Sequence, residues 1–272
     1  MKKLIAIGAL VALIALLPAC KGSTTPRTVT SITMSPSKTW VYIGETAIIH
    51  VSARMSDNSN EAFAGGTWAS DNMAIATVDS AGIVTAVAAG MVNISVTYGG
   101  KTGTVALRCL PNYAGTWTGT YTVTTCAATG DFDLYSFCGV LPSGTVLNTD
   151  LVLTQSGDQV TGQLFLGTLT ATATGPVVMD GHLTLTGRVI EGDFTIDTVY
   201  TLQSTVPGQI TGDMTQLWLA LAATWMGQGQ LTCVMNTFTR SSMMQREPGV
   251  VGLQSLPPNP TLQDLMNALR RR

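Results

Sequence analysis

Short runs of alternating apolar and polar residues fill the chain from Val29 to about residue 240, and turns rich in Gly, Asp and Ser separate these runs. Alternation with a period of two is typical of strands that bury one face and expose the other. Only 11% of the residues are charged and 28 are Gly, which suits strands joined by tight turns. The pattern predicts an all-β protein, and a break at Pro111-Asn112 predicts two domains.

The first domain is expected at residues 29–108. Its short alternating runs are divided by turns such as Gly65-Gly66 and Gly99-Gly100. A regular series of short strands and turns is typical of a β-sandwich. Trp68 is the expected core anchor, because an indole buries a large apolar area between two sheets.

A set of short motifs runs the length of this domain: Ile32 with Ser35-Pro36, Gly44-Glu45-Thr46, Trp68-x-Ser70-x-Asn72, Ile75-Ala76-Thr77-Val78-Asp79, Gly82-x-Val84-Thr85-Ala86-Val87-x-Ala89-Gly90 and Ile94-x-Val96. With these motifs the stretch closely resembles the bacterial Ig-like domain, group 2. Domains of that family serve as spacers and adhesive modules on surface proteins and carry no catalytic residues. The resemblance therefore implies a structural or adhesive role for residues 29–108.

The second domain is expected at residues 112–240. Its turns are short, and Asp180-Gly181 between alternating runs is a strong hairpin signal. Short turns throughout pair each strand with the next, and such a meander of eight strands closes into an antiparallel barrel without exposed edges. The expected strands are residues 115–125, 150–155, 159–166, 168–174, 182–189, 194–204, 209–221 and 228–239.

The first strand of the second domain opens with Gly115-Thr116-Trp117, and Arg240 follows its last strand. In this respect the domain resembles the calycin or lipocalin barrels, in which a basic residue on the last strand covers the tryptophan. The resemblance implies that Arg240 lies over Trp117 and that a small apolar ligand could occupy the barrel. The other interpretation is a barrel filled by its own Leu, Val and Thr side chains.

The N-terminus has the layout of an export signal. Lys2 and Lys3 precede an apolar run over residues 4–17, which is too short for a comfortable transmembrane helix. Cys20 directly follows Leu17-Pro18-Ala19, which resembles the lipobox of bacterial lipoproteins, although Pro18 departs from the usual small or β-branched residue. We expect a signal peptide at 1–19, lipid on Cys20 and a polar tether at 20–28. An ordinary signal peptide with a chance cysteine is the alternative.

The four remaining cysteines form an even set, which in an exported protein suggests disulfides. Cys126 and Cys138 flank the long connection after the first barrel strand, and a bond between them would close a loop of about a dozen residues. Cys109 and Cys233 are then the second expected pair. If Arg240 lies by Trp117, as the resemblance to calycin barrels implies, an antiparallel register brings Cys233 opposite Thr124, which is nearer to Cys126 than to Cys109. This register conflicts with the second pair.

Candidate chemistry is sparse. His50 and His182 each stand alone on an expected strand, outside any ligand spacing. Asp131 and Asp133 could contribute to a Ca²⁺ site, although a solvated loop is the favoured interpretation. Lys101 follows Gly100 in a hairpin turn rather than in a phosphate-binding loop. We expect no catalytic residues, no metal and no cofactor, and a net charge of −2 offers no basic patch for nucleic acid.

Two further segments are apolar or amphipathic. Residues 217–226 are too few to span a bilayer as a helix, so a buried strand running into a cap is expected, with an exposed apolar patch as the alternative. Residues 241–260 are Pro-rich and predict an unstructured tail. A short helix is expected after Thr261, with Leu262, Leu265, Met266 and Leu269 on one face and Arg270, Arg271 and Arg272 at its end.

These features predict a non-enzymatic lipoprotein of the bacterial envelope, anchored to the outer membrane through the lipid on Cys20. The sandwich would be a stalk that presents the barrel for adhesion, binding or envelope assembly, with a protein or glycan partner. The alternative function is a carrier that holds a small apolar ligand inside the barrel.

Overall fold

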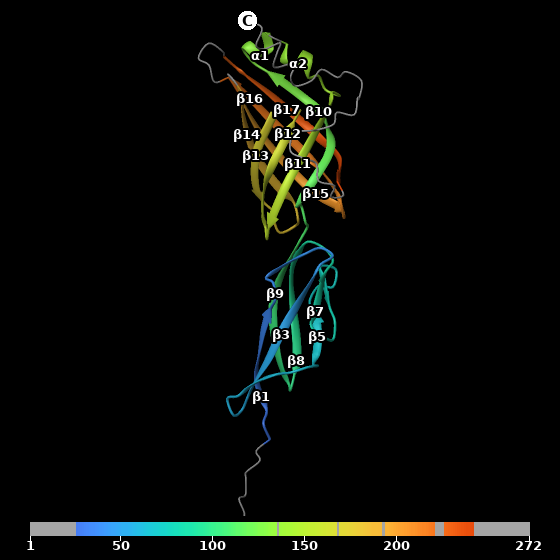
Figure 1. The fold of residues 1–272 in the computed structure, drawn as a ribbon, viewed down its shortest axis with the longest axis vertical. Coiled ribbons are helices and arrows are strands. Elements are labelled where there is room, and N and C mark those ends of the chain that lie inside the picture. Colours follow the sequence, from blue (N-terminus) through green and yellow to red (C-terminus); the bar gives the residue numbers. More distant parts are fainter. Residues whose placement is uncertain (1–25, 135, 168, 192–193, 221–225, 242–272) are drawn as a thin grey trace, which may run out of the picture.

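A sandwich of two β-sheets is followed by a closed barrel of eight antiparallel strands, and the two domains are stacked end to end (Figure 1). The computed structural model describes residues 26–134, 136–167, 169–191, 194–220 and 226–241. The expected signal peptide, Cys20 and the tail from residue 242 onward lie outside these residues. Within the described ranges, no helix is long and apolar enough to cross a membrane.

The sandwich contains nine strands, whereas the alternating runs of the sequence predict seven. One sheet has the strand order β1-β3-β7-β6 with β4 beside β3, and the other has the order β2-β9-β8-β5. The strands are β1 (Val29–Pro36), β2 (Trp40–Tyr42), β3 (Thr46–Met55), β4 (Asn60–Ala62), β5 (Thr67–Ser70), β6 (Ala76–Val78), β7 (Ile83–Ala86), β8 (Gly90–Tyr98) and β9 (Lys101–Leu110).

Alternate residues of the two sheets face each other and form the sandwich core, in which Val41, Ile94 and Leu107 are fully buried. Trp68 packs half-buried against this cluster. A Cβ atom at Gly82 would lie 2.7 Å from the Trp68 ring, and Gly82 also has a φ of +77°. The turn before β7 therefore requires glycine both for its backbone and for the space of the indole.

The barrel is a meander in which each strand pairs with the next, and β17 pairs with β10 to close it. Its strands are β10 (Gly115–Ala128), β11 (Val146–Ser156), β12 (Gln159–Leu166), β13 (Leu169–Pro176), β14 (Leu183–Glu191), β15 (Phe194–Val206), β16 (Gln209–Ala220) and β17 (Gln228–Arg240). Two helical turns, α1 (Asp131–Leu134) and α2 (Phe137–Val140), lie in the connection from β10 to β11, where the pattern predicted only a loop. They cover the end of the barrel that faces away from the sandwich (Figure 1).

Candidate binding surfaces

The barrel interior is a packed core. Trp117, Tyr121, Tyr200 and Trp218 are fully buried and belong to one cluster with the aliphatic side chains of the surrounding strands. Gly119 on β10 lies against the Phe238 ring of β17. A Cβ atom at this position would lie 2.7 Å from the ring, so the packing requires glycine. Four aromatic rings in one small barrel leave this interior filled by its own side chains.

Polar groups inside the barrel are held in their neutral forms. Burial raises the pKa of Cys233 to about 12, and it raises the pKa values of Tyr121 and Tyr200 as well. The buried Gln216 amide accepts a hydrogen bond from Trp218 Nε1 at 3.2 Å. Thiol and phenol groups with raised pKa values are poor nucleophiles and poor bases at neutral pH. The interior therefore provides specific packing rather than reactive chemistry.

Arg240 and Trp117 lie together at the end of the barrel nearest the sandwich. The guanidinium carbon of Arg240 is 4.8 Å from the centroid of the Trp117 ring, which is a cation–π contact. Trp117 Nε1 donates to the Tyr113 carbonyl at 2.8 Å, and Arg240 Nη2 donates to the Asn112 carbonyl. The two residues thus fix the start of the barrel to the segment that leads into it.

The segment 111–114 between the domains is held by hydrogen bonds that are buried or part-buried. Tyr113 Oη donates to the Gly181 carbonyl at 2.6 Å and accepts from the Ser204 amide at 3.2 Å. The Gln155 side chain accepts from the Tyr113 amide at 2.7 Å and donates to the Pro111 carbonyl at 3.1 Å. Because these hydrogen bonds join the segment to the barrel, it is part of the barrel rather than a flexible linker.

Contacts across the domain boundary complete the joint between sandwich and barrel. Arg108 on β9 donates to Asp158 Oδ2 and to the Val177 carbonyl, each at 2.6 Å. Leu110, the last residue of β9, is fully buried within the core cluster of the barrel. Apolar packing and charged hydrogen bonds therefore act on the same short stretch of chain, which favours a fixed angle between the domains.

Two of the grooves formed by the described residues could receive a partner. One, of about 530 Å³, lies at the joint and is lined by residues of both domains, including Val87, Ala89, Pro111, Val206 and Arg240.

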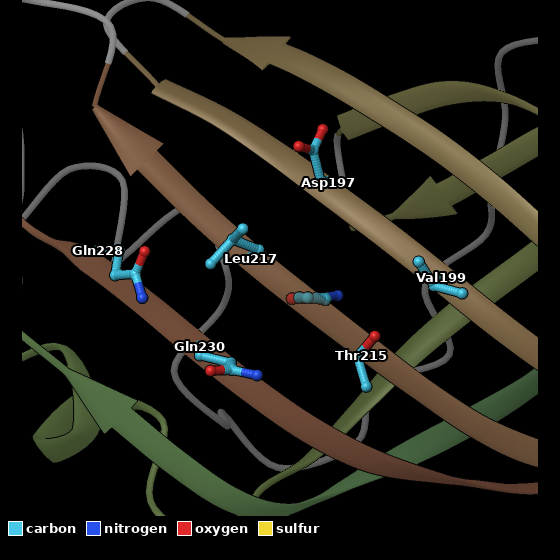
Figure 2. A pocket seen from close by; sticks show the side chains of 7 residues that line it. Asp197, Val199, Thr215, Leu217, Gln228 and Gln230 are labelled. Atoms are coloured by element: carbon cyan, nitrogen blue, oxygen red, sulfur yellow. The ribbon is translucent and has the colours of Figure 1, made fainter.

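The second groove, of about 380 Å³, lies on the outer wall of the barrel across β15, β16 and β17 (Figure 2). Its walls carry the amides of Gln228 and Gln230, the Thr215 hydroxyl and the Asp197 carboxylate, with Leu217 between them. Arg188 forms an ion pair with Asp197, and hydrogen bonding to the guanidinium lowers the pKa of that carboxyl. The outer groove therefore combines neutral amides and a hydroxyl with an ionised, already paired carboxylate.

The distal end of the barrel is closed by α1 and α2. A disulfide joins Cys126 on β10 to Cys138 on α2, with 5.6 Å between their Cα atoms, which confirms the predicted bond. The Phe132 and Phe137 rings meet edge to face at 5.5 Å, and Phe137 contacts Trp218 in the same way at 5.5 Å. The cap is thus tied to the barrel by a covalent bond and by an aromatic cluster.

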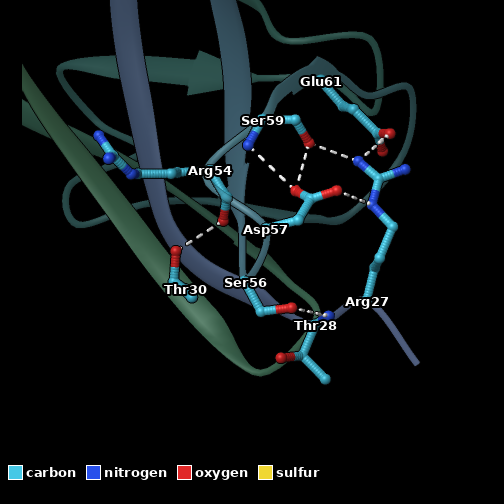
Figure 3. A network of polar contacts seen from close by, with 8 residues as sticks. All are labelled: Arg27, Thr28, Thr30, Arg54, Ser56, Asp57, Ser59 and Glu61. Atoms are coloured by element: carbon cyan, nitrogen blue, oxygen red, sulfur yellow. Dashed lines mark hydrogen bonds and ion pairs between the residues drawn. The ribbon is translucent and has the colours of Figure 1, made fainter. Parts of the chain in front are cut away.

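The opposite end of the molecule, where the described chain begins, is held by a polar network around Arg27 (Figure 3). Arg27 forms ion pairs with Asp57 at 2.8 Å and with Glu61 at 2.7 Å, and it donates a hydrogen bond to Ser59. Hydrogen bonds from Ser59 lower the pKa of Asp57. These contacts pin the N-terminal entry of the chain to the end of the sandwich that is remote from the barrel.

The residues that the sequence singled out for possible chemistry do not come together. His50 is exposed on β3, and Lys101 lies at the start of β9 directly after the hairpin turn. His182 contacts Asp180, with 2.9 Å between Nδ1 and Oδ1, and its hydrogen bonds lower the pKa of Asp180. Asp131 Oδ2 accepts a hydrogen bond from the Met226 amide.

Among the residues that the structure describes, no group of three or more His, Cys, Asp or Glu side chains could hold a metal ion. The apolar stretch 217–226 begins within β16, where Trp218 is buried, and residues 221–225 lie outside the described part.

The second expected disulfide, between Cys109 and Cys233, is not formed. Both residues are free, buried thiols. Cys109 belongs to the sandwich core and Cys233 to the barrel core, so two separately packed interiors hold them apart. Cys233 lies opposite Val123, one residue from the position that the register predicted.

Comparisons with known proteins identify the first domain. Residues 28–108 match the family model of the bacterial Ig-like domain (group 2). This match confirms the expected Ig-like domain. No curated protein matches the sequence.

Solved structures with similar parts include the following two. One is the "REP1-NXSQ fatty acid transporter", at 11% identity and a TM-score of 0.21, covering 48% of this chain and 97% of that chain. The other is domains 5-6 of the S-layer protein SbsC, at 17% identity and a TM-score of 0.25, covering 74% of this chain and 95% of that chain. TM-scores this low carry no inference about function.

Proposed function

We propose that the chain is a lipid-anchored protein of the bacterial envelope, in which the Ig-like domain is a non-enzymatic spacer that holds the barrel away from the membrane. The observation that carries this proposal is the arrangement of the two ends. The chain enters the sandwich beside the Arg27 network, and the barrel is attached to the opposite end of the sandwich (Figure 1). A lipid on Cys20 would then leave the whole length of the sandwich between the membrane and the barrel.

The joint supports a spacer because it resists bending. Arg108 bonds across the boundary to Asp158 and Val177, and Leu110 is buried in the barrel core. A spacer on a flexible linker would let the barrel fold back toward the membrane, whereas a buried joint keeps it at a distance.

The anchor is tested by replacing Cys20 with Ser in the full chain and separating membranes from the soluble fraction. A Cys109→Ser chain is the matched control, since that thiol is buried in the sandwich core. We expect the Cys20→Ser chain to leave the membrane fraction and the control to stay in it. A membrane pool that is the same in both chains would refute the lipid anchor.

We propose that the outer groove of the barrel is the binding surface that the spacer holds away from the membrane. The class of partner that we propose for this groove is a glycan. Amide and hydroxyl groups both donate and accept hydrogen bonds, as recognition of sugar hydroxyls requires. Gln228, Gln230 and Thr215 place such groups along one groove. Binding to a panel of envelope glycans should be lost in Gln230→Ala and kept in Gln163→Ala, an exposed glutamine on β12. Equal binding by both variants would place the partner on another surface.

The packed interior is the reason to favour a spacer with a surface partner over a carrier of a small apolar ligand. Trp117, Tyr121, Tyr200 and Trp218 occupy the space in which such a ligand would lie. Mass spectrometry of the purified full chain decides between the two functions. An apolar molecule bound in a one-to-one ratio would support the carrier and displace the proposal made here.

A further inference from the structure

The distal end of the barrel exposes large apolar side chains. Leu134 on α1 is 77% exposed, Met226 before β17 is 75% exposed and Ile190 near the end of β14 is 67% exposed. Large apolar side chains that gather at one end of a domain mark a candidate interaction surface, unlike single ones scattered over it. We call the surface formed by residues 131–134, Ile190 and Met226 the tip.

Contacts between the segments bring these side chains to the same end. The Asp131 amide donates to the Met226 carbonyl at 2.7 Å, and the Met226 amide donates to Asp131 Oδ2 at 2.7 Å. The Phe132 ring contacts the Phe194 ring at 5.9 Å, which places α1 beside the start of β15. Ile190 pairs with Thr195 in the same β14–β15 hairpin.

The tip is a preformed surface. The disulfide between Cys126 and Cys138 ties α2 to β10, and Phe132 and Phe137 anchor the two helical turns in the barrel core. Gly130 has a φ of +60° and is packed against the Met226 backbone, so the turn into α1 is also fixed. Because the surface is already ordered, binding to it loses little free energy to the ordering of side chains and loops.

The charge of the tip is negative. Asp133 is exposed on α1, and Asp131 lies two residues before it. The described residues of the connections at this end, 129–134, 136–145, 167 and 226–227, include aspartates but no Lys or Arg. The tip therefore suits an apolar partner that carries positive charge, and it disfavours an anionic lipid surface.

The chain itself contains a segment of that chemistry. Residues 261–272 place Leu262, Leu265, Met266 and Leu269 at helical spacing, followed directly by Arg270, Arg271 and Arg272. A helix of about a dozen residues is marginal in water, so its apolar face needs a surface on which to pack. We propose that the segment 261–272 docks on the tip, with its Leu and Met side chains on Leu134, Ile190 and Met226 and its arginines beside Asp133.

The length of the chain permits this docking. Strand β17 has 13 residues and runs from the tip back to the joint, where Ser241 donates to the Thr116 carbonyl. The following residues, 242–260, outnumber those of β17, and an extended chain covers about 3.3 Å per residue. They can therefore return along the barrel to the tip. The covalent link also raises the effective concentration of the segment at the tip above that of a separate partner.

Disulfide trapping in the full chain tests the proposal. Leu134→Cys is combined with Met266→Cys in a Cys20→Ser background, since the other cysteines are either bonded to each other or buried. The matched control combines Met266→Cys with Met73→Cys, a side chain on the sandwich that is 70% exposed. We expect an intramolecular bond to form at least about tenfold faster in the Leu134 pair, at a rate independent of protein concentration.

Two outcomes of the trapping experiment would overturn the proposal. Equal rates in the Leu134 pair and the Met73 pair would show that the segment does not dock at the tip. Cross-linked dimers whose yield rises with protein concentration would show that the tip binds a second copy instead. Melting curves of each reduced variant establish that the fold is intact before the rates are compared.

A charge exchange and its reversal test the choice of occupant. In the Leu134→Cys and Met266→Cys chain, Asp133→Arg should slow trapping several-fold, because it places like charges together. Adding Arg271→Asp to that variant should restore the rate. A rate that does not change with Asp133→Arg would overturn the charge matching that assigns the segment 261–272 to the tip.

Discussion

Arg108 and Asp158 form an ion pair across the boundary between the two domains, with 2.6 Å between Nη1 and Oδ2. The same guanidinium donates to the Val177 carbonyl, so one side chain of the sandwich holds two separate turns of the barrel. Charge-assisted hydrogen bonds of this kind are stronger than neutral ones and fix direction as well as distance. The angle between spacer and barrel therefore depends on a few residues at the joint.

The first prediction is that Arg108→Ala loosens the joint. The substitution removes both contacts to the barrel and should cost about 1–2 kcal/mol of coupling between the domains. Small-angle X-ray scattering should show a wider distribution of interdomain distances. Arg54→Ala is the control, since Arg54 bonds to Asn58 within the sandwich. Identical scattering from the two variants would assign the stiffness of the joint to apolar packing alone.

The second prediction is that the stabilising contribution of the Asp158 carboxylate is lost at low pH. Hydrogen bonds from Arg108 and then Gln159 hold the pKa of Asp158 below its ordinary value. The unfolded chain therefore takes up a proton at a higher pH than the folded chain does. The stabilising contribution is complete above the unfolded pKa of about 3.9 and is lost as pH falls through the lower folded pKa.

This acid dependence can be measured against a matched variant. Because other aspartates with lowered pKa values, such as Asp57 and Asp180, also destabilise the protein in acid, the informative quantity is a difference. The unfolding midpoint of the wild type minus that of Asp158→Asn should be positive at pH 6 and shrink toward pH 3. A difference that stays constant over this range would show that the Asp158 carboxylate does not contribute through its charge.

The third prediction is that Tyr113→Phe destabilises the barrel. The substitution leaves the Gly181 carbonyl and the Ser204 amide without the hydroxyl that now bonds to both. Unsatisfied buried groups cost about 1–3 kcal/mol, and urea unfolding should show a loss in this range. Tyr98→Phe is the control, because Tyr98 stacks on Phe63 and is exposed. A loss no larger than that of the control would mean that water replaces the hydroxyl.

The barrel could be predicted from the sequence largely because its strands are long and alternate, and because turns such as Asp180-Gly181 mark their ends. The short strands β2 and β4 could not, since three residues show no period and β4 is exposed throughout. Helices α1 and α2 have four residues each, which is also too short for a periodic signal.

The candidate binding surfaces were harder to predict from the sequence than the fold. Arg108 and Asp158 are brought together only by the stacking of two domains, and neither residue has a distinctive neighbour in the chain. The outer groove depends on the curvature of the barrel wall, which alternation does not report. The pair of Trp117 and Arg240 could be proposed because the resemblance to calycin barrels supplied it, and the structure brings the two residues into contact.

The fourth prediction is that the disulfide between Cys126 and Cys138 stabilises the barrel by restricting the unfolded chain. The two cysteines are 12 residues apart, and closing a loop of this size is worth about 3 kcal/mol. The Cys126→Ser, Cys138→Ser chain should unfold at lower urea than the wild type, as followed by near-ultraviolet circular dichroism. Dithiothreitol should lower the wild-type midpoint to that of the variant and leave the variant unchanged. If dithiothreitol also shifts the variant, the effect of reduction arises elsewhere than at this bond.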